Sequence, residues 1–424
     1  MDLEFASIDE IYKIQSDLLT AQVDKVYKKC KLMKEKFKNW GIDPADIKGI
    51  DDLNKLPFTT KQELHGWGWD MLAVPSTDIT EVVSTSGTTG GLFYFPLTTR
   101  DLDLLAYGEK MVFSAAGIGK EDKCQITVTL DNLFMAGMAY YLGMQSIGAM
   151  VYRVGPGNIE RQLEVANTLG TTVMVGVPSF LIKLLKLGRF PALRKIILVG
   201  ESILTPDLTF NALGERLKTL TQAELFSSHG ITEIGCSFSE CLAHNGLHAR
   251  PGHIIAEVVD TEGNSVAEGD IGELVVTTLQ LEAMPVIRYK TGDLVVKLPE
   301  TPCACGRNGM RIGPVVARRD QTIKLKGTTV YPSQIQQILF SWPEIVNFQI
   351  IVYSSHDGVD NVLLKIGTLI DEKVILIELQ KAFRSKMRVV PNLEVCTPEE
   401  VERSLQVGGS RKARVFYDCR IKVG

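Results

Sequence analysis

The residues best suited to chemistry begin with a glycine-rich loop that carries hydroxyl groups and no charge. The run VSTSGTTGG at residues 83–91 holds two serines, three threonines and three glycines. Hydroxyls and backbone N–H groups are the groups with which a loop binds phosphate oxygens. A Walker loop would need a lysine after its last glycine, but Gly91 and Leu92 follow Gly90 here. The loop therefore predicts phosphate binding of another kind, with an ordinary turn as the alternative.

Three further segments downstream of the loop each carry a charged residue. Glu233 closes SSHGITE, Asp293 lies in IRYKTGDL, and Lys412 lies in GGSRKARV. Taken singly, each residue also fits a structural role: a helix N-terminal acid, a turn aspartate and a solvated lysine.

The order of these motifs carries a resemblance. With ARRDQTIKLKGTTVYPSQIQ at 317–336, they resemble the adenylate-forming superfamily of acyl-CoA synthetases, adenylation domains and luciferases, from about residue 80 onward. The segments GNIERQLE, SECLAHNGLH and CACGR are most similar to the phenylacetate-CoA ligases. The resemblance implies an ATP-dependent acid–CoA ligase that activates an aryl or arylacetic acid as an acyl-adenylate and then forms the CoA thioester.

The resemblance also assigns roles to single residues. Lys412 would bridge the acyl carboxylate and the α-phosphate, and with Glu233 and Thr88 it forms the expected catalytic set; Glu233 would bind magnesium. Asp293 would bind the ribose of ATP or AMP, and Asp320 would be the hinge of a mobile C-terminal domain. The phosphate loop would be formed by Thr85, Ser86, Gly87, Thr88, Thr89 and Gly90. Further nucleotide contacts are expected from Gly200, Glu201, Ser228, His229, Gly230, Thr232, Arg318 and Lys326.

The acid-binding pocket is expected to be apolar. One wall is predicted in LDNLFMAGMAYYLG at 130–143, with Phe134 and Gly137, and the facing wall near Gly200 and Ser228. An apolar pocket suits an aryl acid better than an amino acid, whose ammonium group would need a buried carboxylate. The alternative for the methionines and aromatics of this stretch is plain core packing.

Three departures from the family pattern leave alternatives open. The lysine that usually follows the loop is missing, and Arg100 could replace it. His229 stands where an aromatic residue is common, and Lys326 replaces an arginine, keeping the charge but not the two-pronged geometry. Two other functions therefore remain: loading of the acid onto the phosphopantetheine of a carrier protein, whose thiol arm is the same, and a degenerate nucleotide-binding protein.

The cysteines divide into a possible metal site and isolated residues. Cys303 and Cys305 form C-x-C, and Cys241 is followed by His244 and His248. Two short clusters of soft ligands can converge on one tetrahedral zinc, as the family resemblance also implies. The predicted ligands are Cys241, His248, Cys303 and Cys305, with His244 as the alternative histidine and free thiols as the alternative to a metal. The other five are predicted to be small buried residues: Cys30, Cys124, Cys236, Cys396 and Cys419.

The elements that must position these residues follow from hydrophobic patterns. Apolar runs alternate with helical patterns between about residues 80 and 235, which predicts a parallel α/β sheet. Closely spaced apolar runs after residue 250 predict a smaller antiparallel β region, and the last hundred residues predict a small α+β domain. An apolar stripe from Val23 to Phe37 predicts one amphipathic helix. The resemblance divides the chain into an AMP-binding domain at 1–319 and a mobile C-terminal domain at 320–424.

Composition limits the partners. The chain has 424 residues, and its formal net charge of −4 is spread along the sequence, which argues against nucleic acid and anionic membranes as partners. The N-terminus MDLEFASIDEIYK lacks the pattern of a signal peptide, and no long apolar run predicts a membrane span. We therefore expect a cytoplasmic enzyme whose partners are a small carboxylic acid and CoA; the resemblance leaves a homodimer open.

Overall fold

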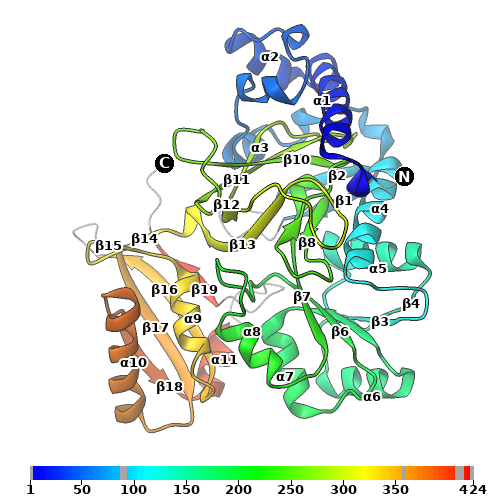
Figure 1. Ribbon diagram of the computed structural model, residues 1–424. Helices are drawn as coiled ribbons and strands as arrows, with labels where there is room; N and C mark the ends of the chain where they lie inside the picture. The colour runs from blue at the N-terminus through cyan, green and yellow to red at the C-terminus, as the bar shows by residue number, and fades with distance from the viewer. Residues whose placement is uncertain (1–2, 86–92, 356–359, 406–414, 421–424) are drawn as a thin grey trace. The chain divides into compact units, whose positions relative to one another are not determined.

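The computed structural model describes residues 3–85, 93–355, 360–405 and 415–420 and divides the chain into two compact units. The first unit comprises Met1–Phe210 and Gly214–Val316, and the second comprises Asn211–Leu213 and Ala317–Gly424. The main division therefore lies close to the predicted boundary before Asp320. Figure 1 shows a large sheet with surrounding helices in the first unit and a smaller sheet in the second.

The first unit has a long helix, α1, near its start, followed by a series of shorter ones. The predicted amphipathic helix is wrong as one element, because the chain leaves the helical conformation at Cys30, whose φ and ψ are −96° and 111°. Its stripe is nevertheless buried on both sides of this break, from Val23 to Phe37. The elements are η1 (Leu3–Phe5), α1 (Ile8–Lys29), α2 (Lys31–Asn39), η2 (Pro44–Asp46), η3 (Ile50–Lys55), α3 (Lys61–Trp67), η4 (Gly68–Met71) and η5 (Ser76–Asp78).

Among the described residues, eleven strands of the first unit form one sheet. The predicted parallel part is confirmed, since β3, β4, β5, β6 and β7 pair in parallel. The strands after residue 250 are antiparallel, but they are not a separate sheet, because β8 and β9 link β7 to β13. The order is β10 (Ile254–Val259), β11 (Ile271–Thr278), β12 (Tyr289–Lys297), β13 (Arg311–Arg318), β9 (Leu247–His248), β8 (Cys236–Ser239), β7 (Glu224–Ile231), β6 (Lys195–Val199), β5 (Val173–Gly176), β3 (Lys123–Ile126) and β4 (Met150–Arg153).

Helices and one hairpin complete the first unit. α4 packs against α5 and β8, and α5 packs against β3 and β4. The antiparallel strands β1 (Ile79–Ser84) and β2 (Tyr94–Thr98) flank the glycine-rich loop, most of which lies outside the described residues. The remaining elements are α4 (Thr99–Ala115), α5 (Met135–Ile147), α6 (Ile159–Leu169), α7 (Pro178–Leu187) and η6 (Thr232–Ile234). The first two residues of α8 (Ala212–Lys218) are assigned to the second unit and the rest to the first.

The second unit is a small α+β fold. Its sheet has the order β15-β14-β17-β16-β19, with β18 also paired to β17. Figure 1 shows α9 and α10 beside these strands. The elements are η7 (Arg319–Gln321), β14 (Ile323–Leu325), β15 (Thr328–Val330), α9 (Pro332–Phe340), β16 (Ile345–Ser354), β17 (Asp360–Thr368), α10 (Glu372–Met387), β18 (Asn392–Cys396), α11 (Pro398–Leu405) and β19 (Phe416–Asp418).

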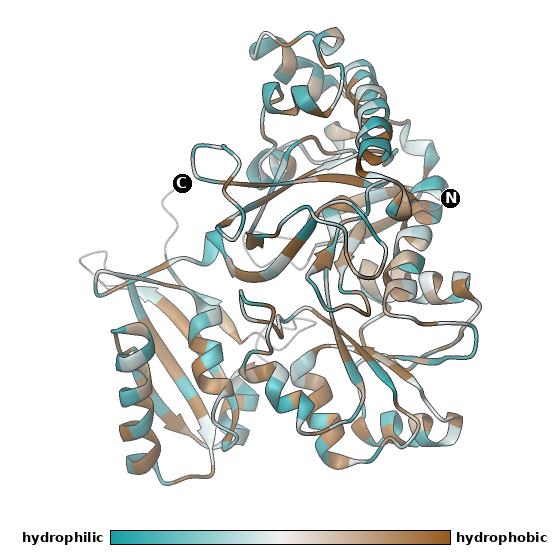
Figure 2. Ribbon diagram, in the orientation of Figure 1, coloured by the Kyte–Doolittle hydropathy of each residue, from teal (hydrophilic) through white to brown (hydrophobic). Residues whose placement is uncertain are grey.

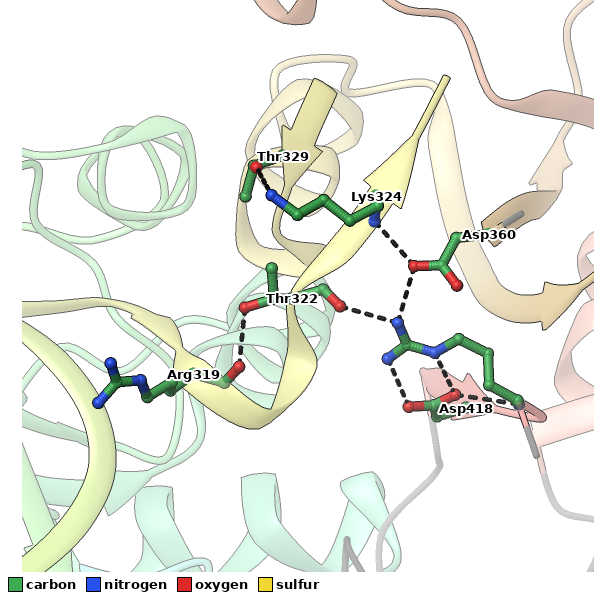
Figure 3. A network of polar contacts seen from close by, with 7 residues as sticks. Arg319, Thr322, Lys324, Thr329, Asp360 and Asp418 are labelled. Carbon is green, nitrogen blue, oxygen red and sulfur yellow. Dashed lines mark hydrogen bonds and ion pairs between the residues drawn. The ribbon is translucent and has the colours of Figure 1, made fainter. Parts of the chain in front are cut away.

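A polar network fixes the first residues of the second unit to its sheet (Figure 3). The Arg420 guanidinium donates to the carbonyl of Thr322 at 2.8 Å and to Asp360 at 2.9 Å. It also forms a two-pronged pair with Asp418, with bonds of 2.8 and 2.7 Å. Asp360 accepts a further bond from the backbone N–H of Lys324 at 2.8 Å. The segment that leads into β14 is therefore tied to β17 and β19.

Hydropathy follows the layers of each unit. In Figure 2 the central strands are mainly hydrophobic, whereas the helices alternate between hydrophobic and hydrophilic residues. Cys30, Cys124 and Cys236 are buried as predicted, but Cys396 is half-buried and Cys419 is exposed. Within the described parts of the chain, no helix is long and apolar enough to cross a bilayer.

Candidate functional site

Two strands that are distant in sequence bring together three predicted site residues. His229 lies on β7, Glu233 on the η6 turn directly after it, and Asp293 on β12. His229 Nε2 and Asp293 Oδ2 are 3.0 Å apart, and the Tyr289 hydroxyl donates to Glu233 Oε1 at 3.0 Å. Glu233 and Asp293 are both buried. The fold therefore brings one carboxylate within hydrogen-bond distance of the His229 ring and places the other on the turn that directly follows the same strand.

The start of the glycine-rich loop is fixed by its own backbone. The Thr85 N–H donates to the Phe93 carbonyl at 3.0 Å, and the Phe93 N–H donates to Thr85 Oγ1 at 3.4 Å. Both residues are buried. The predicted phosphate ligands between them, Ser86, Gly87, Thr88, Thr89 and Gly90, lie outside the described residues.

The other predicted nucleotide contacts of the first unit lie after β6 and along β7. Gly200 follows β6 with φ +79°, a conformation that favours glycine. The Glu201 carboxylate accepts from the N–H and the hydroxyl of Ser179, at 2.8 and 2.9 Å, and so fixes the start of α7. Ser228 donates to the Phe238 carbonyl at 3.2 Å.

Gly230 and Thr232 are the remaining predicted nucleotide contacts of this unit. A Cβ on Gly230 would lie 2.9 Å from the Ser237 hydroxyl, so the backbone of β7 approaches β8 closely there. Thr232 is half-buried and opens the η6 turn that carries Glu233.

The segment predicted to form one wall of the acid pocket is hydrogen-bonded to the start of the glycine-rich loop. Phe134 precedes α5 and is half-buried, and the neighbouring Leu133 carbonyl accepts from the Ser84 N–H at 2.8 Å. Gly137 is buried against the chain of Thr129, where an added Cβ would lie 2.0 Å from a carbonyl oxygen. Gly137 therefore allows close packing of α5 against the chain of Thr129.

The predicted residues of the second unit lie around its first hairpin. Arg318 ends β13 and Asp320 lies in η7. Lys326 and Gly327 have φ of +48° and +81° and form the two-residue turn between β14 and β15. Lys326 Nζ donates to the Val390 carbonyl at 3.1 Å. Lys412 lies outside the described residues.

A second cluster joins the four predicted metal ligands. One ligand atom from each of Cys241, His248, Cys303 and Cys305 lies within 4.8 Å of all the others. The Sγ atoms of Cys241 and Cys303 are 3.7 Å apart, and Cys305 Sγ lies 3.7 Å from His248 Nε2. Two sulfurs on a tetrahedral zinc with bonds of about 2.3 Å would lie about 3.8 Å apart, whereas a disulfide bond is about 2 Å long. The spacing therefore fits a zinc ion.

The charges around the cluster also fit a bound zinc ion. Burial, together with the nearby Arg250, Arg311 and Arg307, lowers the pKa of His248 to about 3, so the imidazole is neutral and able to bind a metal. Zinc with three thiolates and one imidazole carries one negative charge, which these arginines would balance. Three elements supply the ligands: the residues after β8, β9, and the loop between β12 and β13.

The alternative histidine has other partners. His244 Nε2 lies 3.0 Å from Glu224, and His244 Nδ1 lies 3.4 Å from Glu240. The hydrogen bonds to Glu240 and Glu224 raise the pKa of His244 to about 9, although burial opposes them. The imidazole is therefore a paired cation near neutral pH, which is a poor metal ligand.

Tyr289 and Arg100 show which side-chain contacts the sequence alone did not identify. Tyr289, which holds Glu233, stands inside the quoted segment IRYKTGDL, but only the fold shows its partner. Arg100, the suggested substitute for the missing loop lysine, forms an ion pair with Glu282 at 3.3 Å on an exposed part of α4.

Comparisons with known proteins identify relatives along the whole chain. Residues 29–282 match the model of the AMP-binding enzyme family, and residues 327–420 match that of the AMP-binding enzyme C-terminal domain. A phenylacetate-coenzyme A ligase of Thermus thermophilus is 30% identical over 432 residues, covering 100% of this chain and 92% of the relative. A phenylacetate-coenzyme A ligase of Escherichia coli is 29% identical, covering 82% and 78%.

Solved structures share the fold. A 2-hydroxyisobutyryl-CoA ligase in complex with R3-HIB-AMP superposes with a TM-score of 0.82 at 20% identity, covering 98% of this chain and 91% of that one. The O-succinylbenzoate coenzyme A synthetase of Bacillus subtilis, in complex with AMP, gives a TM-score of 0.56 at 19% identity, covering 75% and 65%. Together with the sequence matches, these structures place the chain among adenylate-forming folds.

Proposed function

Because the chain belongs to the AMP-binding enzyme family, we propose that it is an ATP-dependent acid–CoA ligase acting on an aryl or arylacetic acid such as phenylacetate. The observation that carries the proposal is the meeting of β7, η6 and β12, which holds His229 against Asp293 and Glu233 against Tyr289. Full-length relatives named as phenylacetate-coenzyme A ligases support the class of acid.

The reaction has two half-reactions in one site. A carboxylate oxygen of the acid attacks the α-phosphorus of ATP, the bond to the β-phosphate oxygen breaks, and pyrophosphate leaves. The CoA thiolate then attacks the acyl carbon, the bond to the phosphate oxygen breaks, and AMP leaves. The protein must therefore hold two anions close together and stabilise the charge that develops between them.

Each predicted residue has a task in this scheme. Asp293 accepts from the ribose hydroxyls, and His229 stacks beside the adenine. Glu233 would hold Mg²⁺, whose charge would offset that of the phosphates. The loop that starts at Thr85 binds the β- and γ-phosphates, and Lys412 bridges the carboxylate and α-phosphate. The other proposed nucleotide contacts are Gly200, Glu201, Ser228, Gly230, Thr232, Arg318 and Lys326.

The acid would bind beside Phe134, at the end of β1. This location is supported by the bond from Ser84 to the Leu133 carbonyl, which joins the turn before α5 to the start of the phosphate loop. An apolar ring could then lie next to the reacting phosphate.

We further propose that Cys241, His248, Cys303 and Cys305 bind a structural zinc ion. The support is the 3.7 Å spacing of ligand atoms, which matches a tetrahedral ion. These residues join the segment after β8, β9 itself and the loop before β13, so a metal would stabilise the part of the sheet where these three strands meet.

The proposal also covers where the enzyme acts in the cell and how many chains assemble. We place the enzyme in the cytoplasm, where ATP and CoA are available, and we propose a homodimer on the basis of the family resemblance. Light scattering of the purified protein measures the mass of the assembly and tests the dimer.

An acid panel tests the proposed function. The purified protein is supplied with Mg·ATP and with phenylacetate, benzoate or an aliphatic acid, and pyrophosphate exchange and acyl-CoA formation are measured separately. We expect both activities with an aryl acid. Exchange without acyl-CoA would favour carrier-protein loading, and absence of exchange with every acid would favour a degenerate nucleotide-binding protein.

A further inference from the structure

The four proposed zinc ligands come from two separate parts of the first unit, and the N-terminal turn η1 is bonded to both parts. Cys241 and His248 lie in β9 and the segment before it, whereas Cys303 and Cys305 lie in the loop between β12 and β13. Glu4, in η1, is only 2% exposed although it carries a carboxylate. No sequence motif and no step of the proposed reaction accounts for this buried acid.

On one side, Glu4 is bonded to the turn that carries Cys303 and Cys305. The Arg307 carbonyl accepts from the Cys303 N–H at 3.1 Å, and the Arg307 guanidinium shares a hydrogen bond with the Cys305 sulfur. Nε of the same guanidinium donates to Glu4 Oε2 at 2.9 Å. The Glu4 carbonyl also accepts from the Asn308 N–H at 2.7 Å. The turn with the two cysteines is therefore tied to η1 through side chain and backbone.

On the other side, Glu4 is bonded to the segment that carries Cys241 and His248. Arg250, two residues after His248, is fully buried, and its Nη1 donates to Glu4 Oε1. Its Nη2 donates to the hydroxyl of Ser239, which ends β8 two residues before Cys241. The two oxygens of one carboxylate thus join an arginine beside each pair of metal ligands.

The charge of Glu4 cannot by itself favour the metal. A zinc ion with three thiolates and one imidazole carries one negative charge, and a neighbouring carboxylate repels it. If Glu4 acted through its charge alone, its removal would strengthen zinc binding. Its effect through position has the opposite sign, because groups that hold the ligands in place raise the affinity of a metal site.

We propose that Glu4 is a positioning residue of the zinc site, which holds the two ligand pairs at the spacing of a metal ion by bonding Arg250 and Arg307 at once. The inference rests on the proposed zinc site. Zinc binding then depends on a turn more than two hundred residues away in the sequence from the nearest ligand.

Competition with a zinc chelator, using the full-length protein, tests the sign of this effect. Glu4→Gln keeps the size of the side chain and removes the charge that pairs with both arginines. We expect zinc affinity to fall about 10- to 100-fold. Affinity that is unchanged or higher would overturn the proposal.

Glu63→Gln is the matched control for general destabilisation. Glu63 pairs at 2.8 Å with the buried ammonium of Lys36 in the same unit, away from the zinc ligands. This variant should bind zinc as the wild type does. An equal loss of affinity in Glu63→Gln and Glu4→Gln would show that Glu4 acts through overall stability, and would overturn the proposal.

Two further variants keep the proposal testable if Glu4→Gln fails to fold. Glu4→Asp retains the charge but shortens the reach, and Arg307→Lys retains a positive charge beside Cys305 but loses the two-pronged geometry. Each should lower zinc affinity about tenfold or more, and wild-type affinity in both would overturn the proposal.

Substitution with Co²⁺ separates positioning from loss of a ligand. At saturation, each variant should show the same thiolate-to-cobalt charge-transfer bands as the wild type, because all four ligands remain. Loss of these bands would mean that Glu4 maintains the ligands themselves, which would overturn a positioning role. Failure of the wild-type protein to bind Zn²⁺ or Co²⁺ would instead overturn the proposed metal site, and the inference with it.

Discussion

Among single residues, the buried carboxyl group of Glu109 gives a prediction about pH and stability. Glu109 lies on α4 and accepts from the Ser237 hydroxyl at 2.6 Å. Burial raises its pKa from an ordinary 4.5 to about 7, although Ser237 and Arg250 act in the opposite direction. The folded protein therefore binds a proton that the unfolded chain releases between these pH values, so stability falls as pH rises through this window.

The change Glu109→Gln should remove that pH dependence, because the amide mimics the protonated acid and still accepts from Ser237. Relative to this variant, the wild type should lose about 3 kcal/mol of unfolding free energy between pH 4.5 and 7. Urea unfolding at several pH values measures the difference. Asp103→Asn, on the exposed face of the same helix, is the control; a constant difference between wild type and Glu109→Gln would contradict the prediction.

The proposed zinc site gives a second prediction for single residues. Cys303→Ser should reduce zinc from about one ion per chain to nearly none and lower the unfolding free energy by about 2 kcal/mol or more. Elemental analysis and denaturant unfolding measure the two effects. Cys396→Ser, which changes a half-buried cysteine outside the cluster, should alter neither. A wild-type protein purified without chelator and free of zinc would refute the site.

The metal cluster also shows what residue types can and cannot reveal. The sequence indicated soft ligands in two groups, and the fold brings Cys241, Cys303 and Cys305 together. It could not decide between two histidines, because the answer depends on neighbours that are remote in sequence. His244 faces Glu224 and becomes a paired cation, whereas His248 is buried beside arginines and stays neutral.

At the scale of secondary structure, Arg420 holds the entry to the second unit. Its guanidinium bonds to Thr322, Asp360 and Asp418 within one unit, and its side chain is 17% exposed. Arg420→Ala would remove the guanidinium that pairs with Asp360 and Asp418 and should cost about 2 to 3 kcal/mol locally. Hydrogen exchange should then accelerate in β14 and β19. Arg403→Ala, on exposed α11, should leave both strands unchanged; equal exchange in the two variants would contradict this role.

Strands and helices differ in how much of them periodicity predicts. Apolar runs such as TTVMVGV and LRKIILVGES contain β5 and β6, because parallel strands buried on both faces read as continuous hydrophobic segments. The antiparallel strands after residue 250 were also recognisable. Their continuation of the same sheet was not, since it depends on pairing between β8, β9 and β13. The break at Cys30 was hidden because the buried stripe continues across it.

For the whole molecule, the order of motifs was more informative than any single motif. Thr85, Glu233 and Asp293 each had an ordinary structural alternative, yet their order implied an adenylate-forming enzyme, and the family matches confirm that class. The acid pocket was harder to predict, because packing and binding select the same apolar residues. Gly137 shows this difficulty, since its close approach to Thr129 explains the glycine without any ligand.

The proposed use of one site for two half-reactions is a property of the whole molecule and depends on Lys412. Lys412→Ala should reduce acyl-adenylate formation about 100-fold or more, because the ammonium group stabilises charge that develops at the α-phosphate. Thioester formation from supplied acyl-adenylate and CoA should stay close to wild type, since that step no longer needs this charge. Lys381→Ala, an exposed lysine paired with Glu378 on α10, should leave both rates unchanged.

Separate assays of the two steps decide the matter. Pyrophosphate exchange reports on adenylate formation, and release of AMP from supplied acyl-adenylate reports on thioester formation. An equal loss of both rates in Lys412→Ala would mean that the lysine serves binding or folding in general, and a separate use of the site in each step would be refuted. A selective loss of exchange would assign the lysine to the first step, and hydrogen exchange around Asp320 with and without acyl-adenylate would then test whether that segment is the hinge.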